Sequence, residues 1–215
     1  MRRAPIVEAL IDIRTDFAHG PKSADFDTFH ERIKMNYATR KPRIEWRARI
    51  AFGADSPPEQ SSEGGPVGFL YESEDGKQVV QARVNGFTFS RLAPYEDWQG
   101  LRRESEALWG KFRDCFHPSR VVRLAVRFIN RTSLPLPIDD LADWLATRPE
   151  TSGVVGRTSP SFFVRLASRI PDSSAESNVV LFSEPAQSET ELPVMFDIDV
   201  WRRLELDPAS PEGRR

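Results

Sequence analysis

Arginine recurs at strand spacing in this sequence, and guanidinium groups suit fixed, bidentate contacts with phosphate or carboxylate. Arg123, Arg127 and Arg131 fall every fourth residue and alternate with the apolar residues of a predicted strand. Because successive side chains of a strand point to opposite faces, these three arginines are expected to share one face of a sheet. The residues predicted to bind an anionic ligand are Arg47, Arg83, Arg123, Arg127, Asn130, Arg131 and Arg165.

Two interpretations of this arginine-rich face remain open. The face could bind a phosphate-bearing ligand or nucleic acid. Alternatively, the arginines form cross-strand ion pairs, a structural role that the near-neutral net charge of −2 favours. The alternation of this strand places Asn130 on the core side of the sheet. This position favours an amide that is hydrogen-bonded within the sheet over a residue that reads nucleic-acid bases. The acids available for pairing are Glu8, Asp12, Glu45, Asp197 and Asp199.

Residues with catalytic chemistry are sparse. Cys115 and His117 lie two residues apart, but neither a third group nor an oxyanion hole accompanies them. Asp197 and Asp199 share one strand face, as metal-binding carboxylates do in some enzymes, although pairing with arginine or solvation is the favoured interpretation. The histidines lack metal-ligand spacing. We therefore predict no catalytic residue, no metal site and no cofactor.

Composition bounds the class of protein. The chain of 215 residues is 39% hydrophobic and 29% charged, which is typical of a globular protein. Its single cysteine excludes an internal disulfide, and the N-terminus lacks the apolar run of a secretory signal or a membrane span. We expect a cytoplasmic protein that does not enter a membrane. It should form one α+β domain over residues 1–206, with halves 1–118 and 119–206, followed by a disordered tail at 207–215.

Alternating apolar residues predict how the two halves fold. Each half, at residues 6–92 and 121–201, is expected to form a strand, a helix and three strands, and a longer helix at 97–116 follows the first half. A helix is also predicted from Phe26 to Tyr37, stopped by Lys41 and Pro42, and another at 137–149. Residues 54–66 are predicted to form a flexible loop. Asn85 and Gly86 are predicted to form a bulge within one long strand. The predicted fold is therefore two duplicated β-α-β-β-β(-α) halves that form one broad, curved, mainly antiparallel sheet with helices on one face. By analogy, it resembles the saddle of TATA-binding-protein-like folds.

Three sequence blocks carry a resemblance to a known family. Residues 4–9 (APIVEA), 81–95 (containing VNGFTFSRLAPY) and 124–131 (ending RFINR) resemble a sporadically distributed family of uncharacterised bacterial proteins. The resemblance implies no activity, substrate or catalytic residue. Members of that family continue past the last strand into a C-terminal helix, whereas this chain continues with DPASP at 207–211, so the resemblance implies exposed apolar sheet surface here.

These observations favour a binding protein over an enzyme. The leading hypothesis is a module without catalytic activity that uses the polar sheet face or the helices to hold a protein partner or a second copy. The distribution of the resembling family suggests a toxin–antitoxin or defence locus. One alternative is the binding of nucleic acid or a nucleotide through Arg83, Arg123, Arg127 and Arg131. Another is a hydrolase that holds a divalent metal at Asp197 and Asp199.

Overall fold

The protein is built around a single sheet. The computed structural model describes residues 5–51, 59–138, 140–145, 161–186 and 188–210, without the side chains of residues 46–64 and 142. Its elements are β1 (Ile6–Asp16), α1 (Ser23–Ile33), β2 (Thr39–Ala51), β3 (Glu59–Glu72), β4 (Gln78–Arg83), β5 (Gly86–Leu92), α2 (Trp98–Phe116), β6 (Arg120–Pro135), the 3₁₀ turn η1 (Leu141–Asp143), β7 (Phe163–Arg169), β8 (Ala175–Ser183) and β9 (Glu191–Leu206). All nine strands pair antiparallel in the order β2-β3-β4-β5-β1-β6-β9-β8-β7. The predicted α+β class with an antiparallel sheet is confirmed.

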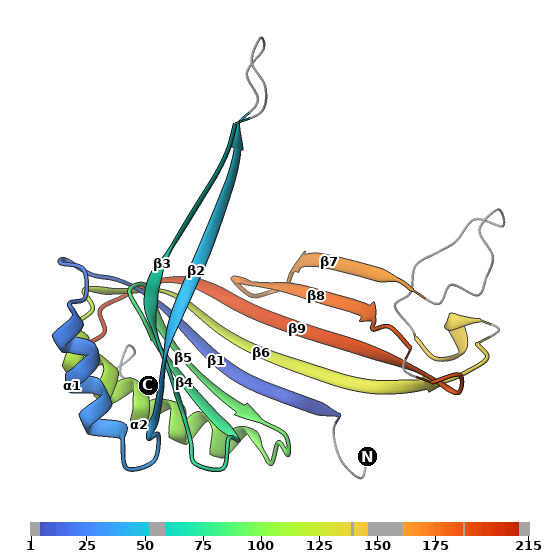
Figure 1. The fold of residues 1–215 in the computed structure, drawn as a ribbon, viewed down its shortest axis with the longest axis horizontal. Coiled ribbons are helices and arrows are strands. Elements are labelled where there is room, and N and C mark those ends of the chain that lie inside the picture. Colours follow the sequence, from blue (N-terminus) through green and yellow to red (C-terminus); the bar gives the residue numbers. More distant parts are fainter. Residues whose placement is uncertain (1–4, 52–58, 139, 146–160, 187, 211–215) are drawn as a thin grey trace.

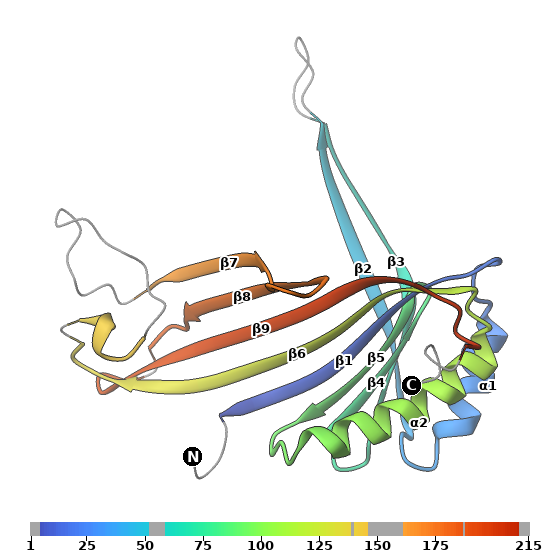
Figure 2. The ribbon, with the colours of Figure 1, turned by 180° about the vertical axis from the view of Figure 1, so that it is seen from behind.

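The two helices of the described part, α1 and α2, lie on the same face of the sheet, at one end of the molecule (Figures 1 and 2). Phe26 and Phe29 of α1 and Phe112 of α2 are buried against the sheet, whose Phe87 and Phe89 are also fully buried. Strand alternation places both β5 aromatics on the helix side of the sheet. The β2–β3 hairpin rises away from the helices on the other side of the sheet (Figure 1).

The predicted helix at 97–116 is confirmed. Its Asp97 side chain accepts a hydrogen bond from the backbone N–H of Gly100 at 2.7 Å, which caps the first turn. His117 ends the helix in the left-handed conformation with φ 48°. The apolar stripe of this helix predicts that Trp98 and Trp109 are both core residues. Trp109 is buried, whereas Trp98 at the start of the helix is 39% exposed, which contradicts that prediction.

The helix α1 is shorter than predicted. It ends at Ile33, and Tyr37 is buried from the connection that follows rather than from the helix. Lys41 and Pro42 lie within β2, not at a helix end. Proline is tolerated in β2 because this strand is at the edge of the sheet, where every other backbone N–H faces away from the one neighbouring strand.

The predicted bulge at Asn85 and Gly86 is wrong. Residues 84 and 85 form the two-residue turn of a hairpin between β4 and β5, in which Ala82 pairs with Phe87. A two-residue turn places even-numbered residues opposite odd-numbered ones. The change of apolar parity in this region is therefore produced by the hairpin, and the one long predicted strand is two strands.

The predicted loop at 54–66 is also wrong for the residues that the structure describes there. Residues 59–66 belong to β3 and pair with β2, for example Gln60 with Ile50. This stretch carries almost no apolar residue, so no periodicity marks it as a strand. Backbone pairing with the strongly alternating β2 defines it instead.

The second half lacks the predicted helix at 137–149 in its described part. Only η1 forms a helical turn there; residue 139 and residues 146–149 lie outside the described part. Ile138 and Leu141 pack on the distal ends of β6, β8 and β9. The apolar face of the predicted helix would also bury Trp144, but this side chain is 52% exposed.

The predicted disordered tail is ordered at its start. Asp207 accepts hydrogen bonds from the backbone N–H groups of Ala209, at Oδ1, and Ser210, at its carbonyl, and Pro208 is buried. Residues 211–215 lie outside the described part. Neither α1 nor α2, the helices within the described ranges, has the length and apolar content needed to cross a membrane.

Candidate functional site

The predicted arginine face exists on the side of the sheet away from the helices. Arg123, Arg127 and Arg131 all lie on β6 at every fourth position, and Arg83 lies on β4. Arg165 lies on β7, at the far edge of the sheet. Arg47 lies within β2, but its side chain is outside the described part.

Asp12 on β1 holds three of the arginines on this face. We name Asp12, Arg14, Arg83, Thr88 and Arg123 the Asp12 cluster. Asp12 Oδ2 accepts hydrogen bonds from Arg83 Nη2 at 2.6 Å and from Thr88 Oγ1 at 2.8 Å, and Oδ1 accepts from Arg14 Nε and Arg123 Nη1, each at 3.1 Å. Arg83 is only 5% exposed and Asp12 only 10% exposed in their side chains. The cluster is therefore a buried charge network that joins β1, β4, β5 and β6.

Burial and charge act in opposite directions on these groups. Burial works to raise the pKa of Asp12, but the charges of Arg83 and Arg14 and hydrogen bonds from Arg83 and Thr88 outweigh it, so the pKa lies below its ordinary value. Burial also lowers the pKa of Arg83, although Asp12 counteracts it. Asp12 therefore stays ionised and can neutralise part of the arginine charge near it.

Asp197 and Asp199 are each paired with an arginine of β6. Arg127 donates to both oxygens of Asp197, at 2.7 and 2.5 Å, and Arg123 Nη2 donates to Asp199 at 2.9 Å. Burial raises the pKa of Asp199 even so. Among the described residues, no cluster of three or more His, Cys, Asp or Glu side chains is placed to hold a metal ion. The two carboxylates are thus held in ion pairs, as the structural interpretation predicts.

The remaining predicted ligand-binding residues make separate contacts. Asn130 donates from Nδ2 to the carbonyl of Phe196 at 3.0 Å, the strand-amide role that its parity favours. Arg131 Nε pairs with Glu184 at 2.7 Å, and Arg165 Nε donates to Asn178 Oδ1 at 2.7 Å. Among the predicted residues whose side chains the structure describes, only Arg83 and Arg123 share a partner.

Cys115 and His117 do not form a catalytic pair. Cys115 is buried on α2, and burial raises the pKa of its thiol above the ordinary value. His117 is exposed beyond the end of the helix. A buried, protonated thiol is a poor nucleophile.

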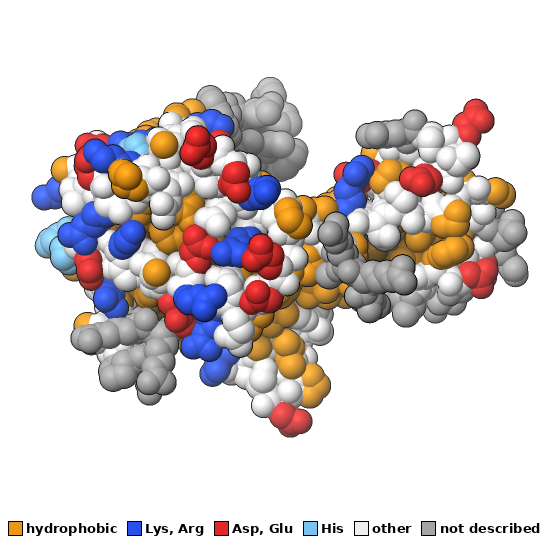
Figure 3. Space-filling view, turned by 90° about the horizontal axis from the view of Figure 1, so that it is seen from below, with side chains coloured by type: hydrophobic (Ala, Val, Ile, Leu, Met, Phe, Trp, Pro, Cys, Tyr) orange, Lys and Arg blue, Asp and Glu red, His pale blue; other side chains and the backbone are white. Residues whose placement is uncertain are grey.

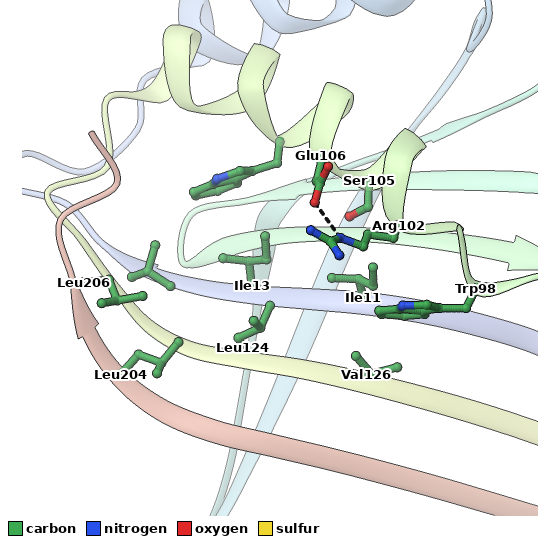
Figure 4. Close-up of a pocket in the computed structure, with 12 residues that line it drawn as sticks. Ile11, Ile13, Trp98, Arg102, Ser105, Glu106, Leu124, Val126, Leu204 and Leu206 are labelled. Atoms are coloured by element: carbon green, nitrogen blue, oxygen red, sulfur yellow. Dashed lines mark hydrogen bonds and ion pairs between the residues drawn. The ribbon is translucent and has the colours of Figure 1, made fainter. Parts of the chain in front are cut away.

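The opposite face carries a hollow that the sequence does not predict. An apolar groove of about 260 Å³ lies between α2 and the adjoining strands (Figure 4). Side chains of α2 point down into it, and side chains of β1, β6 and β9 form its floor. Trp98 and Leu124 are 39% and 41% exposed within it. We define the apolar groove by six of its lining residues: Ile11, Trp98, Trp109, Leu124, Val126 and Leu204.

The groove opens toward strands that no described helix covers. Seen from below, hydrophobic side chains gather between the helix-bearing end of the molecule and its other end (Figure 3). Register explains the position: Leu124 and Val126 of β6 lie opposite Ile13 and Ile11 of β1 and share their face. The helices cover β1 and β5, so the apolar stripe continues uncovered on β6. The apolar residues of β6 are visible in the sequence. That they are left exposed can be inferred only when the order of the strands is known.

No model of a known protein family matches the chain, and no curated protein matches it.

Proposed function

We propose that the protein is a binding protein without catalytic activity, and that it holds a protein partner in the apolar groove. The observation that carries the proposal is the exposure of Trp98 and Leu124 in a groove lined mainly by apolar side chains. Exposed contiguous apolar surface on a folded protein marks an interaction site. A partner would remove this surface from water, which supplies about 25 cal/mol for each Å² of apolar area buried.

The chemistry of the lining favours a protein over a small polar ligand. Polar groups in the groove are few, and Arg102 and Glu106 on its α2 side already bond to each other at 2.7 Å (Figure 4). A small ligand site instead carries converging polar groups that fix its orientation. Apolar and aromatic side chains, with tryptophan among them, are typical of the centre of a protein interface.

The setting in which such a partner acts is part of the proposal. The motif blocks at 4–9, 81–95 and 124–131 resemble a bacterial family, and we place the partner within the same toxin–antitoxin or defence locus. A second copy of the chain is the other candidate partner, and light scattering separates the two.

The test uses affinity purification from cells that express the neighbouring genes. Wild type is compared with Leu124→Arg, which places a charge on the groove floor, and with Met35→Arg as a matched control, because Met35 is 91% exposed and outside the groove. We expect the partner to be lost from Leu124→Arg and retained by Met35→Arg. Retention by both variants, or no partner and no self-association of wild type, would refute the proposal.

We also propose that the two halves of the chain derive from a duplication. In each half the first strand lies at the middle of the sheet, the last strand lies next to it, and the remaining strands follow outward in reverse order. This shared order supports the duplicated, saddle-like arrangement predicted from the sequence. In the described part of the chain the first half has five strands and the second has four, so the predicted three strands after the helix are four in the first half. The second half also has η1 where the first has α1.

A further inference from the structure

Five arginines stand in one cross-strand row on the sheet face away from the helices. Residues directly opposite each other in antiparallel strands point to the same face, so register alone defines the row. It runs in order through Arg43, Gly68, Arg83, Gly86, Arg14, Arg123 and Arg203, from β2 to β9. We name its five arginines the arginine row. It shares Arg83 and Arg123 with the predicted ligand-binding set but adds three arginines from other strands.

The row concentrates like charge. Arg123 lies directly opposite Arg14 on one side and Arg203 on the other, an arrangement that costs free energy unless anions are close. Among the described residues, two carboxylates form ion pairs with the row, those of Asp12 and Asp199. Five guanidinium groups therefore meet two carboxylates. The excess positive charge is a feature that an anionic ligand would relieve.

Several of these guanidinium groups are accessible. The Arg14 side chain is 37% exposed and that of Arg123 is 25% exposed. Arg203 is exposed, makes no ion pair within the described ranges, and lines a hollow of about 330 Å³ together with Arg120 and Glu205. The glycines at positions 68 and 86 add no side chain between the arginines. Buried Arg83 anchors the row while its neighbours face solvent.

The dimensions of the row select an elongated ligand. From β2 to β9 it crosses six strand spacings, about 29 Å along the sheet at about 4.8 Å each. A single phosphate would contact one or two of the arginines, whereas a chain of phosphates can contact all of the exposed ones. Trp201 lies on the same face with the Arg123 guanidinium 5.1 Å from its ring centroid, and an aromatic ring beside a basic track is typical of sheets that bind single strands.

We propose that the arginine row binds the phosphodiester backbone of single-stranded nucleic acid. This site lies on the opposite face from the apolar groove, so it adds a second ligand to the proposed protein partner. Guanidinium forks bind phosphate oxygens in pairs, and each phosphate contact releases counterions, so the affinity falls as salt rises. Exposed Glu45 and Glu205 flank the ends of the row, two residues beyond Arg43 and Arg203, and weaken its field.

The test is fluorescence anisotropy with a labelled oligodeoxythymidine of about 20 nucleotides, longer than the ~4–16 nucleotides that one single-strand-binding fold covers. Arg203→Gln removes a row arginine that has no ion pair to lose, so folding is preserved. Arg103→Gln is the matched control, because Arg103 is exposed on α2 and makes no ion pair among the described residues. Each variant is measured over a potassium chloride series.

We expect wild type to bind with a salt slope that Arg203→Gln lowers by about 0.7, the value of one single-strand phosphate contact. Affinity should fall severalfold in Arg203→Gln, stay unchanged in Arg103→Gln, and rise in Glu205→Gln. No binding at low salt, an equal effect of the two arginine substitutions, or tighter binding of a duplex of the same length would overturn the proposal. Leu124→Arg should leave oligonucleotide binding intact, which separates failure here from failure of the protein-binding function.

Discussion

The Asp12 cluster gives the most quantitative prediction, because one substitution removes a charge from a buried network at little change in shape. Asp12→Asn keeps an oxygen that accepts hydrogen bonds but leaves Arg83, whose side chain is 5% exposed, without its opposite charge. Breaking a buried ion pair by removing one partner costs about 3–5 kcal/mol. For a chain of this length each kcal/mol lowers Tm by about 2–4 °C, so Tm should fall by about 6–20 °C.

The matched control is Asp197→Asn on the same face. Its partner Arg127 is 42% exposed, so water can solvate the guanidinium after the pair is broken. The loss should be about 1 kcal/mol or less. Urea unfolding followed by tryptophan fluorescence and by circular dichroism measures both variants. Equal losses for the two substitutions, or a loss below about 1 kcal/mol for Asp12→Asn, would refute the assignment of a buried network.

A double substitution tests the same reasoning from the other side. Asp12→Val with Arg83→Met replaces the buried pair by apolar side chains, a change that is often neutral or stabilising. The double variant should therefore be more stable than Asp12→Asn. If it is less stable, the pair contributes more than its mutual charge compensation, and the estimate above is wrong.

Three further predictions concern acid stability, thiol reactivity and backbone geometry. Because the folded-state pKa of Asp12 is lowered, its contribution to stability is present above its unfolded pKa of about 3.9 and is lost as pH falls through the folded pKa. The difference in unfolding free energy between wild type and Asp12→Asn should therefore shrink below about pH 4. A difference that stays constant with pH would contradict this. Cys115 should not react with a thiol reagent at neutral pH until urea unfolds the protein, because burial raises its pKa and blocks access; fast native labelling would argue against the burial of α2. Gly86→Ala should cost about 2 kcal/mol or more, since Gly86 has φ 149° and an added Cβ would lie 2.1 Å from the Ile13 carbonyl oxygen; unchanged urea stability would contradict the close β1–β5 pairing.

Strong periodicity was sufficient to predict α2 and β6 from the sequence. Each carries an uninterrupted apolar stripe, and a helix or strand that buries one face must display its period. The strand at 59–66 could not be predicted, because its sequence has almost no apolar residue and its partner strand defines it. The hairpin turn at residues 84 and 85 was predicted as a bulge, because either a bulge or a two-residue turn moves the apolar residues from even-numbered to odd-numbered positions.

The candidate sites were harder to predict than the elements. Alternation places Arg14, Arg83 and Arg123 on the polar face, but only the strand order brings them around Asp12. Arg203 joins the arginine row through pairing between β6 and β9, which no local pattern encodes. The apolar groove likewise depends on where the helix layer ends above the sheet. Sequence periodicity predicts on which face of the sheet a residue lies. Predicting a site also requires knowing which residues lie beside it on the neighbouring strands.

Site-specific photo-crosslinking from the groove tests the central claim most directly. A photoreactive phenylalanine analogue replaces Leu124 on the groove floor in one variant and exposed Met35 in another. Irradiation in cells that express the neighbouring genes should crosslink a protein to the first variant and none to the second. A first variant that crosslinks nothing, or that crosslinks no more than the second, would contradict a protein-binding role for the groove.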